Sequence, residues 1–214
     1  MKKIKYLSLA ALLVAGLSSC SNSGHEEASH EAATHEESNH GAETAGGTYA
    51  VDIAKSTVAW KGTMVGMYSH EGTINITEGS ITTANGAVTG GSFTIDAGSI
   101  ATTDDDALYA MAPREDLEGH LKSDDFLGAA SNPTGSFTIT SVDGSTVTGN
   151  LSLKGKTNEE VFTDVSVSEA NGSVTISGAL TFDRQKYGIS FQKGGDMIVS
   201  DDIELTISLA GTAN

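Results

Sequence analysis

Apolar and polar residues alternate with a period of two along most of the chain after Thr48. This alternation predicts β-strands that have one face in a dry interior and the other in water. Turn signals such as Asn85-Gly86, Asp143-Gly144 and Asn171-Gly172 separate the strands and favour tight hairpins. The sequence therefore predicts an all-β antiparallel domain of about eight strands, with alternating apolar positions at Val58 and Trp60, Ile74 and Ile76, Phe93 and Ile95, Phe137 and Ile139, Val147, Leu151 and Leu153, Val165 and Val167, Val174, Ile176, Leu180 and Phe182, and Ile203, Leu205, Ile207 and Leu209.

Two architectures satisfy this pattern, a sandwich and a closed barrel with its apolar face inward. A barrel of about eight strands has an interior that side chains just fill, or that just holds one small ligand. Aromatic residues make up only 6% of the chain, and Gly72, Gly149 and Gly178 fall at inward-facing positions, where they add no bulk. These features favour an under-filled interior for an apolar guest, whereas the alternative is a core that Leu, Ile and Phe close completely.

A membrane-spanning barrel has the opposite pattern, with apolar residues outward and aromatic girdles at both interfaces. The outward face of these strands is made of Thr, Ser, Glu and Lys. The sequence therefore excludes a membrane-spanning barrel.

Between the third and fourth expected strands, about forty residues lack the alternation, far more than a hairpin loop needs. The run Asp104–Asp106 suits a helix N-terminus, and Leu108 and Met111 follow it at helical spacing. Pro113 is expected to open a second short helix. The buried side of that helix is predicted to consist of Leu117, Leu121 and Phe126. Such a segment is most simply a helical lid over an open end of the barrel.

The start of the chain has the features of an export signal. Lys2, Lys3 and Lys5 precede an apolar run from Leu7 to Leu17, and Leu17-Ser18-Ser19-Cys20 resembles the lipobox of bacterial lipoproteins. In that class the cysteine is acylated and becomes the N-terminus. Since Cys20 is the only cysteine, we expect lipidation at Cys20 after removal of residues 1–19, and the alternative is a plain secretory peptide.

Cleavage would remove three of the 12 basic residues and none of the 28 acidic ones, which leaves a net charge of −19. This charge argues against nucleic acid or anionic lipid headgroups as direct partners. Residues 20–47 show no apolar periodicity and are expected to form a disordered tether, with a barrel domain over residues 48–214.

Histidines recur every fifth residue in this segment, at His25, His30, His35 and His40. Five residues advance an ideal helix by about 140°, so these side chains would not share a helix face. The segment is at most a weak chelator of zinc, copper or nickel, and a solvated spacer is the alternative. No preformed metal site and no cofactor are expected.

Several segments, taken together, resemble the YceI-like family. The resemblance covers roughly Tyr49 to Ala210, and its pieces are His70–Gly72, Leu117–Phe126, Asn132–Phe137, Leu151–Thr157, Asp183–Ile189 and Asp201–Leu205. It implies a lipocalin-like antiparallel barrel, periplasmic or lipid-anchored, whose members hold polyisoprenoid or fatty-acid-like chains and are not established as enzymes. Dimers occur in that family, so a homodimer is compatible with the resemblance.

The expected apolar lining combines the inward strand positions with the lid. It comprises Trp60, Ile74, Ile76, Phe93, Ile95, Leu108, Met111, Leu121, Phe126, Phe137, Leu151, Ile176, Leu180, Phe182, Ile203 and Leu205. Polar residues that continue the apolar faces, or that lie on the lid, are expected at the rim because unpaired burial of charge is costly. These are His70, His120, Arg184 and Asp201. Either Arg184, together with His70 or His120, meets the polar head of a bound lipid, or Arg184 pairs with Asp201 or Asp116 to fasten the lid.

The sequence offers little for catalysis. It has no Gly-x-Ser-x-Gly elbow, and Asp104–Asp106 lacks the spacing of a calcium loop. Two functions remain. The first is a non-enzymatic envelope lipoprotein, anchored on the periplasmic face or at the cell surface, that binds or carries a long apolar molecule such as a polyisoprenoid. The second is a ligand-free structural or stress-related surface lipoprotein with a metal-binding His/Glu tail.

Overall fold

The computed structural model describes residues 46–195 and 197–213. Within these residues the chain forms eleven strands, all in one antiparallel sheet. The first six strands are β1 (Thr48–Val51), β2 (Thr57–Met64), β3 (Tyr68–Ile74), β4 (Ile76–Ala84), β5 (Ala87–Asp96) and β6 (Ala101–Thr102). The remaining strands are β7 (Thr134–Asp143), β8 (Thr146–Leu153), β9 (Lys156–Ala170), β10 (Ser173–Asp183) and β11 (Val199–Ala213).

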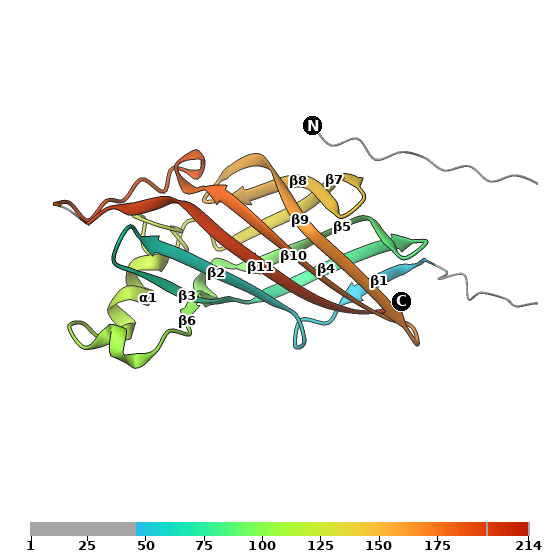
Figure 1. Ribbon diagram of the computed structural model, residues 1–214, viewed down its shortest axis with the longest axis horizontal. Helices are drawn as coiled ribbons and strands as arrows, with labels where there is room; N and C mark the ends of the chain where they lie inside the picture. Colours follow the sequence, from blue (N-terminus) through green and yellow to red (C-terminus); the bar gives the residue numbers. More distant parts are fainter. Residues whose placement is uncertain (1–45, 196, 214) are drawn as a thin grey trace, which may run out of the picture. The chain divides into compact units, whose positions relative to one another are not determined.

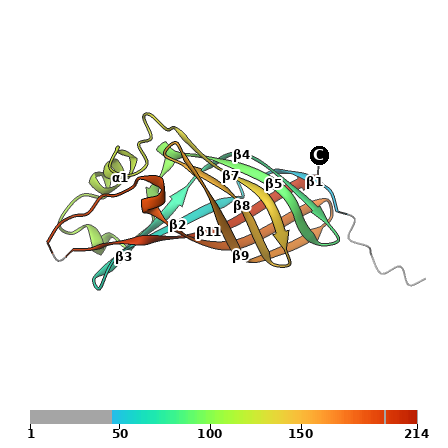
Figure 2. The same cartoon turned by 90° about the horizontal axis from the view of Figure 1, so that it is seen from above.

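Eight of these strands close into a barrel in the order β1, β4, β5, β7, β8, β9, β10, β11. Pairing of Tyr49 in β1 with Ala213 in β11 completes the ring. The predicted closed antiparallel barrel is therefore confirmed, and the sandwich is excluded. Strands β2, β3 and β6 continue the wall from β11 toward one end. Figures 1 and 2 show the β2–β3 hairpin and α1 at that end, with β1 and the C-terminus at the opposite end.

Tight turns set the register of the hairpins. Asn85-Gly86 and Asn171-Gly172 have positive φ at both central positions, 53° and 74° in the first and 51° and 72° in the second. This is the type I′ geometry that matches the twist of paired strands. Lys154-Gly155 adopts the same geometry, with φ of 49° and 72°. The sequence pattern identified the two Asn-Gly turns but not this third one.

Inward-facing residues of the strands form the core. In β10, for example, Val174, Ile176 and Leu180 are buried, while Thr175 and Ser177 are exposed. Phe137 and Phe162 meet edge to face, with ring centroids 4.9 Å apart, and each is 2% exposed. The period-two pattern thus describes the interior correctly.

Three inward glycines have a different role from the one expected. A side chain at Gly149 would overlap the Phe137 ring, and one at Gly72 would overlap the backbone of Ala101. A Cβ at Gly178 would lie 3.1 Å from Val165 Cγ2. Neighbouring atoms occupy the space that a side chain at these three positions would need, so the glycines do not leave the interior hollow.

The segment between β6 and β7 contains α1 (Arg114–Lys122) and the short 3₁₀ turn η2 (Asp106–Tyr109). Pro113 is the N-cap residue of α1, and Glu115 and Asp116 occupy its first turn, as expected from the favourable interaction of carboxylates with a helix N-terminus. Leu121 is buried on its inner side. The predicted helical lid between the third and fourth strands of the ring is therefore present. Two further 3₁₀ turns are η1 (Ala97–Ser99) and η3 (Arg184–Tyr187). No helix among the described residues is long and apolar enough to cross a membrane.

Candidate functional site

The barrel contains a cavity of about 330 Å³ at the end covered by α1. This volume is at the small end of the range of about 300–1,000 Å³ that is typical of ligand pockets. Residues of β2, β3, β5, β7, β8, β9, β10 and β11 contribute to the wall, and residues of α1 and the loop after it contribute to the cover. The end of the cavity lined by His120, Phe191 and the exposed Lys193 is called the mouth below.

Many of the residues proposed from the sequence as apolar lining surround this cavity. They are Trp60, Ile74, Phe93, Ile95, Leu121, Phe126, Leu151, Phe182, Ile203 and Leu205. Phe137 and Ile176 instead line a second cavity of about 40 Å³, to which Phe93 also contributes. Ile76 and Leu180 are 4% and 2% exposed and belong to the packed core without lining either space.

Leu108 and Met111 do not lie inside the barrel. Leu108 is 42% exposed and Met111 is 98% exposed, so their assignment to the apolar lining is wrong. The expected first helix is only the four-residue turn η2. The residue of this turn that contacts the inside of the barrel wall, at His70, is Tyr109. The Tyr109 ring lies 5.7 Å from the His70 ring, centroid to centroid. A helical spacing inferred from two apolar residues therefore identified the wrong face.

The sequence interpretation also omitted residues that line the cavity. Val58, Leu153 and Ile207 stand at inward positions that the alternation had already marked, so the signal was present for these three. Ile100, Leu127, Ile189 and Phe191 come from irregular segments, where no period indicates direction. The further lining residues are Gly62, Thr63, Met64, Tyr68, Leu117, Ser136, Phe162, Lys193 and Val199.

Arg184 borders the cavity but is 0% exposed. Its Nε donates to the carbonyl of Ser200 at 2.8 Å, its Nη1 to the carbonyl of Ile189, and its Nη2 to the carbonyl of Val199 at 3.2 Å. Nη2 also pairs with Asp201, at 3.0 Å. Each guanidinium nitrogen thus has a partner, so the group ties Ile189 to the start of β11 and is not free for a lipid head.

Asp201 is the exposed partner of this pair, and its side chain is 56% exposed. It does not line the cavity. Of the two pairings considered for Arg184, the one with Asp201 is present, and an ion pair with Asp116 is absent from the described residues. The acceptors of Arg184 are Ile189 and the first three residues of β11, so this cluster holds the start of β11 and does not fasten α1.

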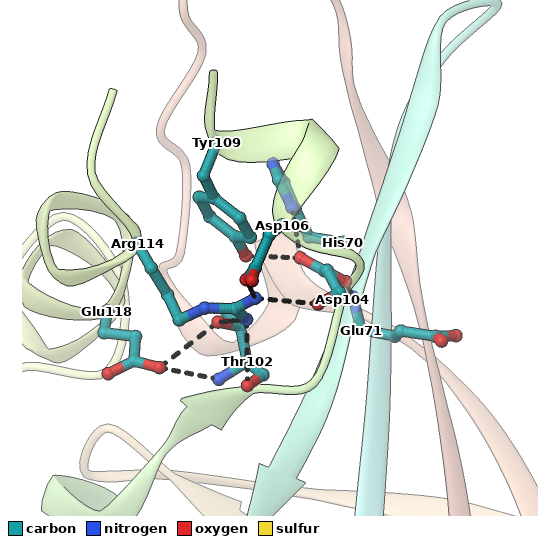
Figure 3. Close-up of polar contacts among 8 residues, drawn as sticks. All are labelled: His70, Glu71, Thr102, Asp104, Asp106, Tyr109, Arg114 and Glu118. Carbon is teal, nitrogen blue, oxygen red and sulfur yellow. Dashed lines mark hydrogen bonds and ion pairs between the residues drawn. The ribbon is translucent and has the colours of Figure 1, made fainter. Parts of the chain in front are cut away.

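His70 and Asp104 form a polar cluster beside the cavity (Figure 3). The Asp104 side chain is 1% exposed and lies 2.6 Å from Nδ1 of His70. It also accepts hydrogen bonds from the Tyr109 hydroxyl and from the backbone N–H of Glu71. The expectation that Asp104–Asp106 would be a solvated helix cap is therefore wrong for Asp104, which continues the inward parity of Thr102 beyond β6.

Burial of Asp104 tends to raise the pKa of its carboxyl group, but the hydrogen bonds from Tyr109, the Glu71 N–H and His70 outweigh that effect. Together they lower the pKa below its usual value. The carboxyl group is therefore ionised at neutral pH. Burial, and then the hydrogen bond to Asp104, raise the pKa of Tyr109, whose hydroxyl remains a donor.

Two residues of α1 attach it to the free edge of β6, as Figure 3 shows. The Glu118 carboxylate accepts from the backbone N–H of Thr102 at 2.9 Å, and Arg114 donates to the Thr102 carbonyl at 3.1 Å. Arg114 also donates to the carbonyl of Asp104 and to the Asp106 carboxylate, at 2.7 Å each. These side chains occupy backbone groups that a neighbouring strand would otherwise pair.

His120 lies on α1 at the mouth. Its Nε2 is 3.0 Å from an Asp125 carboxylate oxygen, and its ring meets Phe126 and Phe191 edge to face at 5.0 and 4.5 Å. Both rim histidines therefore line the cavity, each with a carboxylate partner. Within residues 46–195 and 197–213, no group of three or more His, Cys, Asp or Glu could hold a metal ion. The proposed lipidation site Cys20 and the weak metal candidates His25, His30, His35 and His40 lie outside these residues.

Comparison with known proteins places this geometry in a family. Residues 49–210 match the model of the YceI-like domain. A UPF0312 protein of Staphylococcus epidermidis is 38% identical over 96 residues, which cover 39% of this chain and 55% of that protein. A UPF0312 protein of Staphylococcus aureus is 35% identical over 105 residues, which cover 44% of this chain and 60% of that protein. The chain thus matches little more than half the length of these relatives.

Two solved structures share the fold. BcnA of Burkholderia cenocepacia superimposes with a TM-score of 0.63 at 21% identity, over 76% of this chain and 99% of BcnA. A polyisoprenoid binding domain from Saccharophagus degradans, implicated in plant cell wall breakdown, superimposes with a TM-score of 0.58 at 14% identity, over 78% of this chain and 98% of that domain. Since the family model covers about three quarters of the sequence, the chain belongs to the YceI-like family.

Proposed function

We propose that this protein binds and carries one long-chain apolar molecule, such as a polyisoprenoid, in the cavity of its barrel without chemical conversion. The observation that carries the proposal is the cavity itself, a space of about 330 Å³ whose wall is made mainly of aliphatic and aromatic side chains. Transfer of apolar surface from water into such a space is favourable by about 25 cal/mol per Å². The fold shared with a polyisoprenoid binding domain supports the ligand class.

We further propose that the protein works in the bacterial envelope as a lipoprotein anchored through Cys20. The support is the sequence alone, namely the basic start, the short apolar run and the lone cysteine after Leu17-Ser18-Ser19. Replacement Cys20→Ser is expected to move the chain from the membrane fraction to the aqueous fraction and to abolish its labelling by radioactive palmitate. Retention of the label in this variant would contradict the anchor.

A cavity-filling substitution tests the carrier function. Gly62 lines the cavity, and a Cβ there would lie 3.6 Å from Ile203 Cδ1, which is ordinary contact. Gly62→Leu should therefore place its side chain in the cavity without displacing the wall. We expect the affinity for farnesol to fall roughly a hundredfold, because each excluded methylene contributes about 0.8 kcal/mol. The emission of Trp60, the only tryptophan, reports binding because its side chain lines the cavity.

Gly90→Leu is the matched control. Gly90 is also a strand glycine, it lines neither cavity, and a Cβ there would meet nothing within 4 Å. Organic extracts of the protein from its native host should contain a long-chain apolar molecule for the wild type and Gly90→Leu, but not for Gly62→Leu. Equal farnesol binding by both variants, or the absence of such a molecule from the wild type, would refute the proposal.

A further inference from the structure

Two histidines line the cavity, and the carboxylates that they contact differ in burial. His120 uses Nε2 for its contact with Asp125, which is an exposed carboxylate. His70 uses Nδ1 for Asp104, and its Nε2 has no hydrogen-bond partner anywhere in residues 46–195 or 197–213. The His70 side chain is 21% exposed, and the residue lines the cavity. Nε2 is therefore the ring nitrogen of this cavity-lining side chain that no described residue engages.

The surroundings of His70 fix both its orientation and its tautomer. Tyr68 meets the ring edge to face at 5.1 Å, and the Tyr109 ring lies on it at a tilt of 32°. Asp104 is ionised and accepts hydrogen bonds only, so the proton of a neutral His70 ring must be on Nδ1. In that neutral tautomer, Nε2 is a hydrogen-bond acceptor held in one direction.

Apart from His120 and the exposed Lys193 at the mouth, the other polar groups of the wall do not select in this way. The guanidinium group of Arg184 already donates to backbone carbonyls, and the Thr63 hydroxyl forms a hydrogen bond with the Ser69 hydroxyl at 2.9 Å. The hydroxyl groups of Tyr68 and Ser136 can donate or accept, so they do not distinguish ligand classes. The indole N–H of Trp60 has no acceptor among the described residues, but protein atoms cover it completely, so a ligand cannot reach it.

We infer that the cavity selects a long-chain alcohol or phenol, whose hydroxyl group donates a hydrogen bond to Nε2 of His70 while its apolar chain fills the barrel. This inference rests on the proposed carrier function. A hydrocarbon leaves Nε2 without a partner once water is displaced, and an ether or ester offers only acceptors. A carboxylate also lacks a donor, and it would add a second negative charge close to ionised Asp104.

The test compares four probes that share one chain: farnesol, farnesyl methyl ether, farnesene and farnesoic acid. Binding to the wild-type protein at neutral pH is measured by Trp60 emission and, independently, by displacement of Nile red. Farnesol should bind about tenfold more tightly than the ether and the hydrocarbon, as one desolvated hydrogen bond predicts. Farnesoic acid should bind more weakly than farnesol.

Asp104→Asn gives a result that general destabilisation cannot mimic. The amide nitrogen of the variant donates to Nδ1 of His70, which moves the ring proton to Nε2 and makes that atom a donor. The preference for farnesol over farnesyl methyl ether should then disappear, and the affinity for the ether should rise severalfold relative to farnesene. Asp143→Asn is the control and should keep the wild-type order, because Asp143 is exposed and lines neither cavity.

The outcomes separate this inference from the proposed function. If all four probes bind the wild type equally, or if farnesoic acid binds best, the assignment of His70 as the hydroxyl acceptor is wrong and the carrier function stands. If Asp104→Asn keeps the wild-type preference for farnesol, the tautomer argument is overturned. If no probe binds the wild type, the carrier function and this inference fail together.

Discussion

Replacement of Arg184 by methionine is expected to lower the free energy of unfolding by about 4 kcal/mol, because several backbone acceptors lose their donor at once. Arg184 is completely buried, and it serves the carbonyls of Ile189, Val199 and Ser200. Methionine has a similar length but cannot donate to these carbonyls. Urea unfolding, followed by circular dichroism, measures the loss.

Asp201→Asn is the matched control for this prediction. Asp201 is the charged partner of Arg184, but its side chain is more than half exposed, so water replaces much of the interaction. The expected cost is less than about 1 kcal/mol. Similar losses for the two variants would mean that the ion pair, and not the backbone carbonyls, accounts for the role of Arg184.

Phe162→Ala is expected to cost about 4 kcal/mol and to lengthen the usable interior of the barrel. Phe162 is 2% exposed and lines both the main cavity and the smaller one, as do Phe93 and Ile207. Its ring therefore forms part of the partition between the two spaces. Once the ring is removed, longer prenols should bind more tightly relative to farnesol than they do to the wild type.

Phe191→Ala provides the comparison, because Phe191 lines the mouth and is only partly buried. It should cost clearly less stability and should leave the preference for chain length unchanged. The measurements are the free energy of unfolding in urea and the relative affinities of farnesol and geranylgeraniol. An unchanged length preference in Phe162→Ala would show that this ring does not limit the depth of the cavity.

Much of the barrel could be predicted because the signals for its strands and turns lie within short stretches of the sequence. Alternation marks the inward residues of each strand, and the Asn-Gly turns mark two of the hairpins by themselves. The choice between sandwich and barrel depended on the pairing of β1 with β11, whose residues lie more than 150 positions apart. The family resemblance favoured the barrel, whereas periodicity alone left both architectures open.

The polar part of the site was harder to predict because its partners come from distant segments. Asp104 and His70 are 34 positions apart, and no local pattern indicates that this carboxylate turns inward. Parity placed Arg184 correctly next to the cavity, but it could not show that the carbonyls of Ile189 and of the start of β11 accept its hydrogen bonds. Leu108 and Met111 were misplaced because the segment forms one 3₁₀ turn, whose period differs from that of an α-helix.

The position of β1 bears on how the barrel can be held. The described chain begins at Gly46 and enters β1 at the far end from α1 and the β2–β3 hairpin, as both ribbon views show. Any force transmitted through the residues before Gly46 therefore acts on the rear of the barrel.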